Sequence, residues 1–122
     1  NLDTHVTEGS GKAVSIAEYF NTMLDTSMSW DTAAAIREQW GGTFVLKGVM
    51  SVGDALRAVE IGADAIMISN HGGRQLDGSR APFDQLPEIV DAVGGRIEII
   101  CDGGVRRGTH VLKALCSGAT AA

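Results

Sequence analysis

The most chemically distinctive part of this chain is the nine-residue block Ser69–Asp77, with the sequence SNHGGRQLD. The apolar run Ala65–Ile68 just before it predicts a buried strand. Two glycines would be enough to turn the chain, yet here they separate an imidazole, His71, from a guanidinium, Arg74. Imidazole titrates near neutral pH, and loops that follow the strands of an α/β barrel build active sites. We therefore predict that this block is the catalytic centre.

Two other predicted strands also end in residues that could serve chemistry. The strand 43–47 ends in a lysine, and the strand 97–101 is followed by the glycine-rich segment Asp102–Gly108, DGGVRRG. Neighbouring parallel strands lie about 4.8 Å apart, so groups at equivalent ends can reach one ligand. We expect five side chains to meet there: Lys47, His71, Arg74, Asp102 and Arg106. A strand-end lysine by itself is usually a surface charge, and it is the convergence that favours a site.

The segment Asp102–Gly108 directly precedes a predicted helix. Glycines expose backbone N–H groups, and a helix N-terminus adds positive potential, which together suit a phosphate. Arg106 would add a bidentate grip on phosphate oxygens. The alternative is a plain strand-to-helix turn with solvated arginines, and spacing does not exclude it.

The periodicity of apolar residues predicts an alternation of strands and helices. Strands are expected at 43–47, 65–69 and 97–101, and helices at 15–27, 30–40, 52–61, 83–93 and 109–117, with Ser29 and Ser51 as N-caps. Pro82 and Pro87 both suit the first turn of a helix, so a short turn is expected before the helix within 83–93. Residues 118–122 look like the beginning of a fourth strand.

An internal repeat supports this order. Residues 56–65 and 112–121 share a pattern of helix end, glycine stop and small residues, at an offset of 56. Strands in this order form a parallel sheet with crossovers of one hand. The fold class is therefore α/β, part of a TIM (β/α)8 barrel, which needs about 250 residues in full. We expect residues 1–28 to be a loop and short helix, and 29–122 to hold three βα units and the start of a fourth.

The composition excludes several other classes. The formal net charge of the 122 residues is −5, which does not favour nucleic-acid binding, and no apolar run approaches the roughly 20 residues of a membrane span. The first 12 residues carry no apolar core of a secretory signal. Cys101 and Cys116 form no CxxC pair, so no metal is expected, and both are interpreted as small buried hydrophobes in a reducing compartment.

The motifs together carry a family resemblance. VLKG at 45–48, SNHGGRQLD at 69–77 and DGGVRRG at 102–108 occur in that order, with Asp54-Ala55 and Lys113-Ala114-Leu115 between and after them. The chain from about residue 29 resembles the FMN-dependent α-hydroxy-acid dehydrogenases and oxidases, a TIM-barrel family. The segment 18–40 looks closest to the bacterial quinone-linked L-lactate dehydrogenases.

The resemblance implies a role for each candidate residue. His71 matches the base that takes the proton as a 2-hydroxy acid becomes a 2-keto acid, and Arg74 matches the group that grips the substrate carboxylate. Lys47 matches the cation beside the N1/O2 edge of the flavin. Positions that hold the ribityl chain and phosphate of FMN are matched by Asp102, Gly103, Gly104 and Arg106. The implied partners are a small 2-hydroxy acid, best L-lactate, an electron acceptor (quinone, cytochrome or oxygen) and further copies of the chain.

The resemblance also implies what is missing. In the family, upstream strands supply an aspartate that pairs with the catalytic histidine and tyrosines that contact substrate, so the isolated 122-residue chain is expected to be inactive or nearly so. Two alternatives remain: another FMN- or phosphate-binding barrel, such as an inosine-monophosphate-dehydrogenase-like or isopentenyl-diphosphate-isomerase-like enzyme, and a non-enzymatic half-barrel scaffold. A cytoplasmic location is expected, with peripheral attachment to the inner membrane as the other option.

Overall fold

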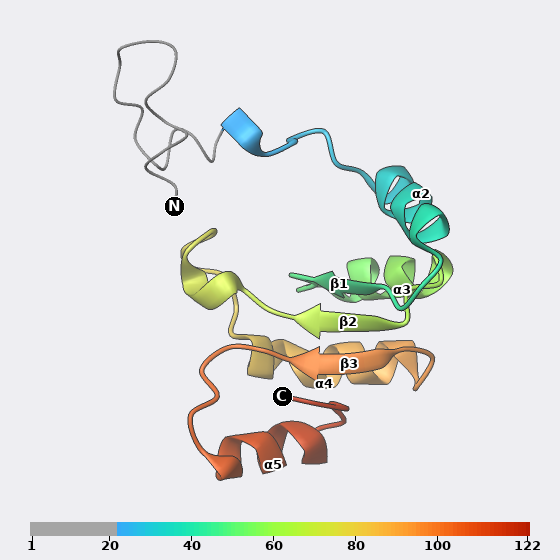
Figure 1. Cartoon of the computed structure of the whole chain (residues 1–122). Helices are drawn as coiled ribbons and strands as arrows, with labels where there is room; N and C mark the ends of the chain where they lie inside the picture. Colours follow the sequence, from blue (N-terminus) through green and yellow to red (C-terminus); the bar gives the residue numbers. More distant parts are fainter. Residues whose placement is uncertain (1–21) are drawn as a thin grey trace, which may run out of the picture.

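The computed structural model describes residues 22–122, which form three parallel strands flanked by helices (Figure 1). The element order is α2 (Trp30–Trp40), β1 (Val45–Lys47), α3 (Val52–Glu60), β2 (Ala65–Ile68), the short 3₁₀ helix η1 (His71–Gly73), α4 (Pro82–Val93), β3 (Glu98–Cys101) and α5 (Gly108–Cys116). The sheet order is β1-β2-β3, and both pairings are parallel. The predicted alternation of strands and helices is confirmed over these residues.

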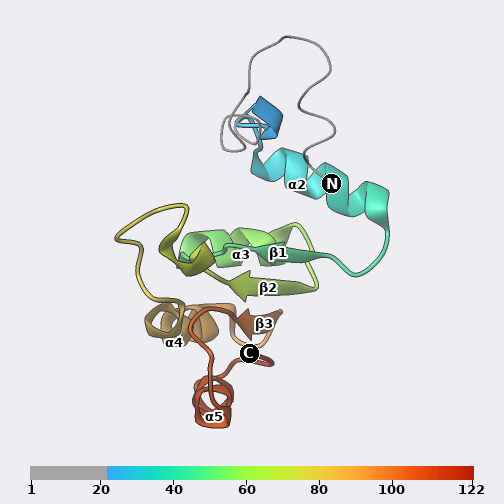
Figure 2. The same cartoon turned by 60° about the vertical axis from the view of Figure 1, so that its left-hand side comes forward.

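The register of the sheet separates two faces. Leu46, Ile66 and Ile99 align across the strands, and Ile66 and Ile99 are buried against the helices together with Ile68. Lys47, on the opposite face, aligns with residues of β2 and β3 that are only partly covered. Successive side chains of a strand point to opposite faces, so the alternation places the apolar core on the helix side. Figure 2 shows α3 and α4 lying along the same side of the sheet.

Helix α2 begins and ends where the sequence predicts. The Ser29 hydroxyl accepts a hydrogen bond from the Thr32 backbone N–H at 3.3 Å, and the Thr32 hydroxyl accepts one from the Ser29 N–H, which completes a capping box. Gly41 ends the helix in the left-handed conformation. Ser51 caps α3 in the same way, through the Asp54 N–H at 3.0 Å. Both predicted N-caps are confirmed.

Two helix predictions are wrong in part. Pro82 is the first residue of α4, as expected, but Pro87 lies inside the helix rather than in its first turn. The missing N–H of Pro87 removes one backbone hydrogen bond, and the burial of Leu86 and Ile89 on either side of it offsets this loss. In the predicted helix 15–27, residues 24–27 are not helical.

The Asp25 side chain explains the end of that first segment. Its carboxylate accepts hydrogen bonds from the backbone N–H and the hydroxyl of Ser27, at 2.8 and 2.6 Å, and this local turn competes with a helix. These two bonds also lower the pKa of Asp25. Residues 15–21 of the predicted helix lie outside the described residues, and the predicted boundary between 1–28 and 29–122 stays a prediction.

The predicted start of a fourth strand is confirmed. Ala121 forms a parallel bridge with Ile100, and its carbonyl accepts a hydrogen bond from the Cys101 N–H at 2.9 Å. The Thr120 N–H donates to the Ile99 carbonyl at 2.7 Å. The chain after α5 therefore returns to the free edge of β3, as a βα repeat requires.

The turn between α5 and this bridge makes a specific steric prediction. A Cβ added at Gly118 would lie 2.5 Å from Cγ1 of Val90 in α4, whereas one added at Gly95 meets nothing within 4 Å; both glycines have positive φ, +98° and +75°. Gly95→Ala should cost about 1 kcal/mol through backbone strain, and Gly118→Ala about 1–3 kcal/mol more through the clash. Urea denaturation of the two variants measures the difference. Equal losses of stability would contradict the close approach of the turn at Gly118 to Val90 of α4.

Candidate active site

The loop that follows β2 is held by its own side chains. The side-chain Oδ1 of Asn70 accepts a hydrogen bond from the Gly72 N–H at 3.0 Å, and the side-chain Nδ2 donates to the Arg80 carbonyl at 3.3 Å. Asn70 thus caps η1 and also joins the beginning of the loop to its end. Arg80 continues the connection into α4 through an ion pair with Glu88 at 2.7 Å. The Arg80 contact lowers the pKa of Glu88.

His71 has an uncommon backbone conformation. Its φ of 57° lies in the left-handed region, which costs a residue with a side chain about 1–2 kcal/mol. The Ser69 hydroxyl accepts a hydrogen bond from the His71 N–H at 3.2 Å and holds this conformation. On the imidazole side, Gly48 leaves room: a Cβ there would lie 3.0 Å from Cε1 of His71. The buried Ser69 and the neighbouring Gly48 therefore determine the position of the exposed His71 side chain.

An ion pair spans the open face of the sheet from β1 to the end of β3. Lys47 Nζ lies 2.6 Å from Oδ2 of Asp102, and the Ser69 hydroxyl donates to the same oxygen at 3.0 Å. The hydrogen bonds from Lys47 and Ser69 lower the pKa of the Asp102 carboxyl. Ser69 thus contacts both the carboxylate of Asp102 and the backbone of His71.

These groups line an open pocket of about 400 Å³ at the carboxyl ends of the strands. Its lining residues are Lys47, His71, Gly72, Arg74, Gln75, Asp102 and Gly103. The structure thus brings four of the five predicted side chains together, with Gly103 beside them. Arg106 and Gly104 do not line this pocket; Gly104 borders a second cavity instead.

The segment between β3 and α5 offers backbone donors. The Gly103 N–H points to the Asp102 carboxylate, while the N–H groups of Gly104 and Val105 donate no hydrogen bond within the described part of the chain. The next N–H, of Arg106, donates to Nδ1 of His110 at 3.3 Å. Free N–H groups just before a helix N-terminus fit an anionic group such as a phosphate.

Sequence reasoning missed three contributors to this site. Ser69 and Asn70 lie inside the SNHGGRQLD block but were not predicted as site residues, and Gly48 was seen only as part of a motif. Ser69 could have been found by strand alternation, since it falls two residues after Met67, on the face that carries Lys47. The fit of Gly48 against His71 depends on packing between two loops, for which the sequence has no local signal.

Metal-ligating groups and membrane-spanning helices are absent from the described residues. No group of three or more His, Cys, Asp or Glu side chains in residues 22–122 is placed to hold a metal ion, and no helix there has the length and apolarity to cross a membrane.

The prediction that both cysteines are buried is right for one of them. Cys101 is buried, but Cys116 is exposed, so the prediction for Cys116 is wrong. Cys116 lies two positions after the buried Ala114, which turns it about 200° around the helix toward solvent.

Comparison with known proteins identifies the family. The model of the FMN-dependent dehydrogenases matches residues 2–122, so the chain belongs to the FMN-dependent dehydrogenase family. Members of this family use FMN as the cofactor. The match agrees with the resemblance carried by the three motifs.

Individual relatives agree with this assignment. The chain is 52% identical over 103 residues to an L-lactate oxidase of Nostoc sp. and 43% identical over 120 residues to an L-lactate dehydrogenase of Actinobacillus pleuropneumoniae. It is also 53% identical over 93 residues to a pre-mycofactocin synthase of Mycolicibacterium smegmatis. These matches cover 84%, 96% and 76% of the chain but 28%, 32% and 23% of the relatives. The chain therefore spans less than a third of the length of each.

A solved structure confirms the fold. Mandelate oxidase with (S)-4-hydroxymandelic acid superposes with a TM-score of 0.83 and 41% identity, over 95% of this chain and 33% of that one. The chain thus has the α/β architecture of part of an FMN-dependent TIM barrel, which confirms the predicted fold class.

The residues present fit the cofactor of the family. Lys47 and Arg74 line the open pocket at the strand ends, and free backbone N–H groups lie on the segment between β3 and α5. These donors match an anionic, phosphate-bearing group. Lys47 is bound to Asp102 here, and a flavin ring would compete for the same amine. The assignment of individual residues to FMN stays a prediction.

The Lys47–Asp102 pair makes a prediction for acid titration. Since its pKa is lowered in the folded chain, Asp102 adds stability above the ordinary aspartate pKa and loses it as the pH falls through the lowered value. Lys47→Met should raise the Asp102 pKa, because it removes the principal hydrogen bond. Carboxyl ¹³C NMR titration measures it, with Arg57→Met as a charge-matched control on α3. An unchanged titration in Lys47→Met would contradict the pair.

The Gly48–His71 contact predicts a local effect. Gly48→Ala should displace the imidazole, because its Cβ would press on Cε1 at 3.0 Å and the φ of +91° disfavours alanine. NMR shifts of the His71 ring protons should change, while Gly41→Ala, also at positive φ but with nothing within 4 Å, should leave them unchanged. The same ring shifts in both variants would argue against the contact.

Proposed function

We propose that the protein containing this chain oxidises an L-2-hydroxy acid, with L-lactate as the best candidate, to the 2-keto acid with FMN. The observation that carries the proposal is the pocket that holds His71 and Arg74 beside the Lys47–Asp102 pair. A base and a guanidinium on one short loop suit a substrate that carries a hydroxyl next to a carboxylate.

His71 is the base in this proposal. It takes one proton as the alcohol carbon becomes a carbonyl carbon, and the flavin, when bound, supplies the two-electron oxidising chemistry. The left-handed backbone and the Ser69 contact fix where the imidazole reaches. Arg74 binds the substrate carboxylate through its planar fork, which orients the hydroxyl toward the base.

The remaining predicted residues would hold the cofactor. Lys47 would place a cation where negative charge collects on the reduced flavin, which is electrostatic preorganisation. Asp102 and Gly103 would contact the ribityl chain, while Gly104 and Arg106 lie on the segment that offers free N–H groups for the phosphate.

The relatives support the reaction class more firmly than the substrate. L-lactate oxidase and L-lactate dehydrogenase favour L-lactate, whereas the pre-mycofactocin synthase is equally similar over this part. The family assignment argues against the other phosphate-binding barrels. The half-barrel scaffold stays an alternative for the protein that contains this chain, and the flavin experiment below tests it.

The finer partners belong to the same proposal. We propose quinone, cytochrome or oxygen as the electron acceptor, a homo-oligomeric assembly and a cytoplasmic location, with peripheral attachment to the inner membrane as the alternative. The support is the resemblance to bacterial L-lactate dehydrogenases and a relative of that name. Cell fractionation with and without a high-salt wash distinguishes the two locations.

The proposal predicts bleaching of a bound flavin by substrate. The purified protein should show a yellow flavin spectrum, and anaerobic L-lactate should bleach it. His71→Asn should slow the bleaching by about 10²–10⁴-fold, the usual contribution of a general base, while FMN stays bound. Arg74→Lys should raise the L-lactate concentration for half-maximal rate by about tenfold, since a point charge replaces the fork.

Arg57→Lys on the exposed side of α3 is the matched control and should leave the bleaching rate unchanged. Full-rate bleaching in His71→Asn would exclude His71 as the base. A protein that never binds FMN would contradict the proposed function and favour the scaffold.

A further inference from the structure

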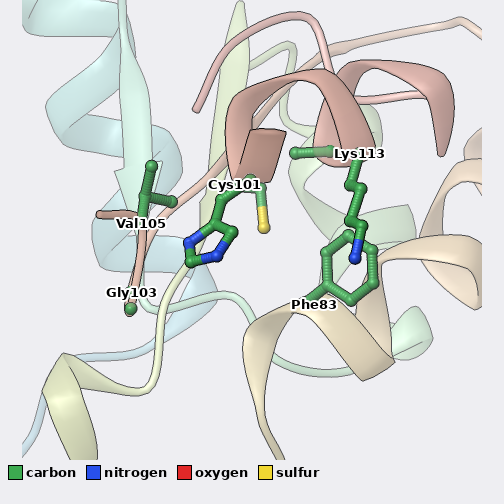
Figure 3. A pocket seen from close by; sticks show the side chains of 8 residues that line it. Phe83, Cys101, Gly103, Val105 and Lys113 are labelled. Carbon is green, nitrogen blue, oxygen red and sulfur yellow. The ribbon is translucent and has the colours of Figure 1, made fainter. Parts of the chain in front are cut away.

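A second cavity, of about 260 Å³, lies beside the β3–α5 connection (Figure 3). Cys101 lines it, and this residue faces the helix side of the sheet, whereas Asp102 faces the open side. The two cavities share Gly103. The second cavity thus lies between α4 and α5. It borders the segment proposed for FMN through Gly103 and Gly104, while its other lining residues have no role in the proposed reaction.

The walls of the cavity are mainly apolar. Cys101 and Ala114 in its lining are buried, while Phe83 and Val105, also in the lining, remain 42% and 38% exposed. In Figure 3, Phe83 on α4 and Val105 on the connection before α5 lie on opposite sides of Cys101. A bound apolar group would remove part of this exposed surface from water, which is favourable.

The polar side chains of the lining are donors. Nδ1 of His110 accepts a hydrogen bond from the Arg106 N–H at 3.3 Å, which leaves Nε2 as the ring nitrogen that can donate. Lys113 adds an ammonium group, and Figure 3 shows its side chain extending from α5 toward the cavity.

No carboxylate lines the cavity, so these donors have no acidic partner in its wall. Burial raises the pKa of the Cys101 thiol, and the nearby Asp102 raises it further, which keeps the sulfur uncharged. The charge balance of the lining is therefore positive, and an anionic ligand would complement it.

We propose that this cavity binds a small organic anion, with its carboxylate toward Lys113 and His110 and its apolar body between Phe83 and Val105. Its volume suits a body of one aromatic ring or a short branched alkyl chain, since a cavity of about 150 Å³ accommodates benzene. The site is distinct from the one that would take the 2-hydroxy acid, and it does not depend on the proposed oxidation.

Benzoate serves as the probe in an NMR titration of the ¹⁵N-labelled chain. Saturable shifts of the Val105, His110 and Lys113 amides are expected at millimolar concentrations, typical of a ligand this small. Acetate, which lacks the apolar body, and benzyl alcohol, which lacks the charge, should each bind at least about fivefold more weakly at these amides. Acetate binding as tightly as benzoate would overturn the proposal, because the apolar walls would then contribute nothing.

Variants test the charge. Lys113→Met should weaken benzoate about threefold or more at these amides, and Lys113→Arg should retain binding. Lys113 is exposed, so neither change disturbs the core, and Arg57→Met controls for the loss of one positive charge elsewhere. Equal binding by Lys113→Met and the unmodified chain would overturn the assignment of the carboxylate.

The catalytic pocket needs its own control, because Arg74 could also bind benzoate. In Arg74→Met, shifts near residue 74 should disappear while those of Val105, His110 and Lys113 persist. Shifts confined to residues 71–75, or lost throughout the chain in Arg74→Met, would show that benzoate binds only the catalytic pocket and would overturn the second site.

Discussion

The two hydrogen bonds of the Ser69 hydroxyl are the interactions on which the rest of the site depends. The hydroxyl donates to Asp102 and accepts from the His71 N–H, so one buried side chain sets both the carboxylate at the end of β3 and the backbone of His71. Asp102 in turn holds Lys47 on β1. Three strand ends are thereby connected by hydrogen bonds among side chains rather than only by the sheet. A left-handed His71 would be unfavourable without this support.

This connection is possible only because of the sheet register. Parallel pairing aligns Lys47 with Met67 and Met67 with Ile100, and the residues two further on, Ser69 and Asp102, fall on the same face. A slip of one residue in β2 would turn Ser69 toward the helices and bring an apolar side chain to the open face. Burial of Ile66 and Ile68 against α3 and α4 prevents that slip. The apolar core thus fixes the positions of the polar groups on the opposite face.

Much of this architecture could be predicted from local sequence signals. Apolar runs marked the strands to within two residues, and serines and glycines marked the ends of α2 and α3. The meeting of Lys47, His71, Arg74 and Asp102 followed from their places at parallel strand ends. The local signals failed where tertiary packing decides. Pro87 is tolerated inside α4 by burial, and the Gly48–His71 contact joins loops 23 residues apart.

Arg106 shows a second limit of prediction from the sequence. Its position was predicted from the spacing DGGVRRG. The structure places it between β3 and α5, as expected, but outside the pocket that His71 and Arg74 line. Its backbone N–H is instead used by His110. Spacing within a loop predicts which residues are available, whereas the direction of each side chain depends on turns that the spacing does not specify.

The composition of the pocket that contains His71 and Arg74 bears on which part of a substrate it could recognise under the proposed function. Its lining residues are all polar or glycine, and no apolar side chain is present to contact the variable group of a 2-hydroxy acid. Such a lining can distinguish a carboxylate and a hydroxyl, but discrimination between a methyl and a phenyl group needs apolar contact area. Under the proposed function, the residues of this pocket therefore suit the carboxylate and hydroxyl that all 2-hydroxy acids have in common.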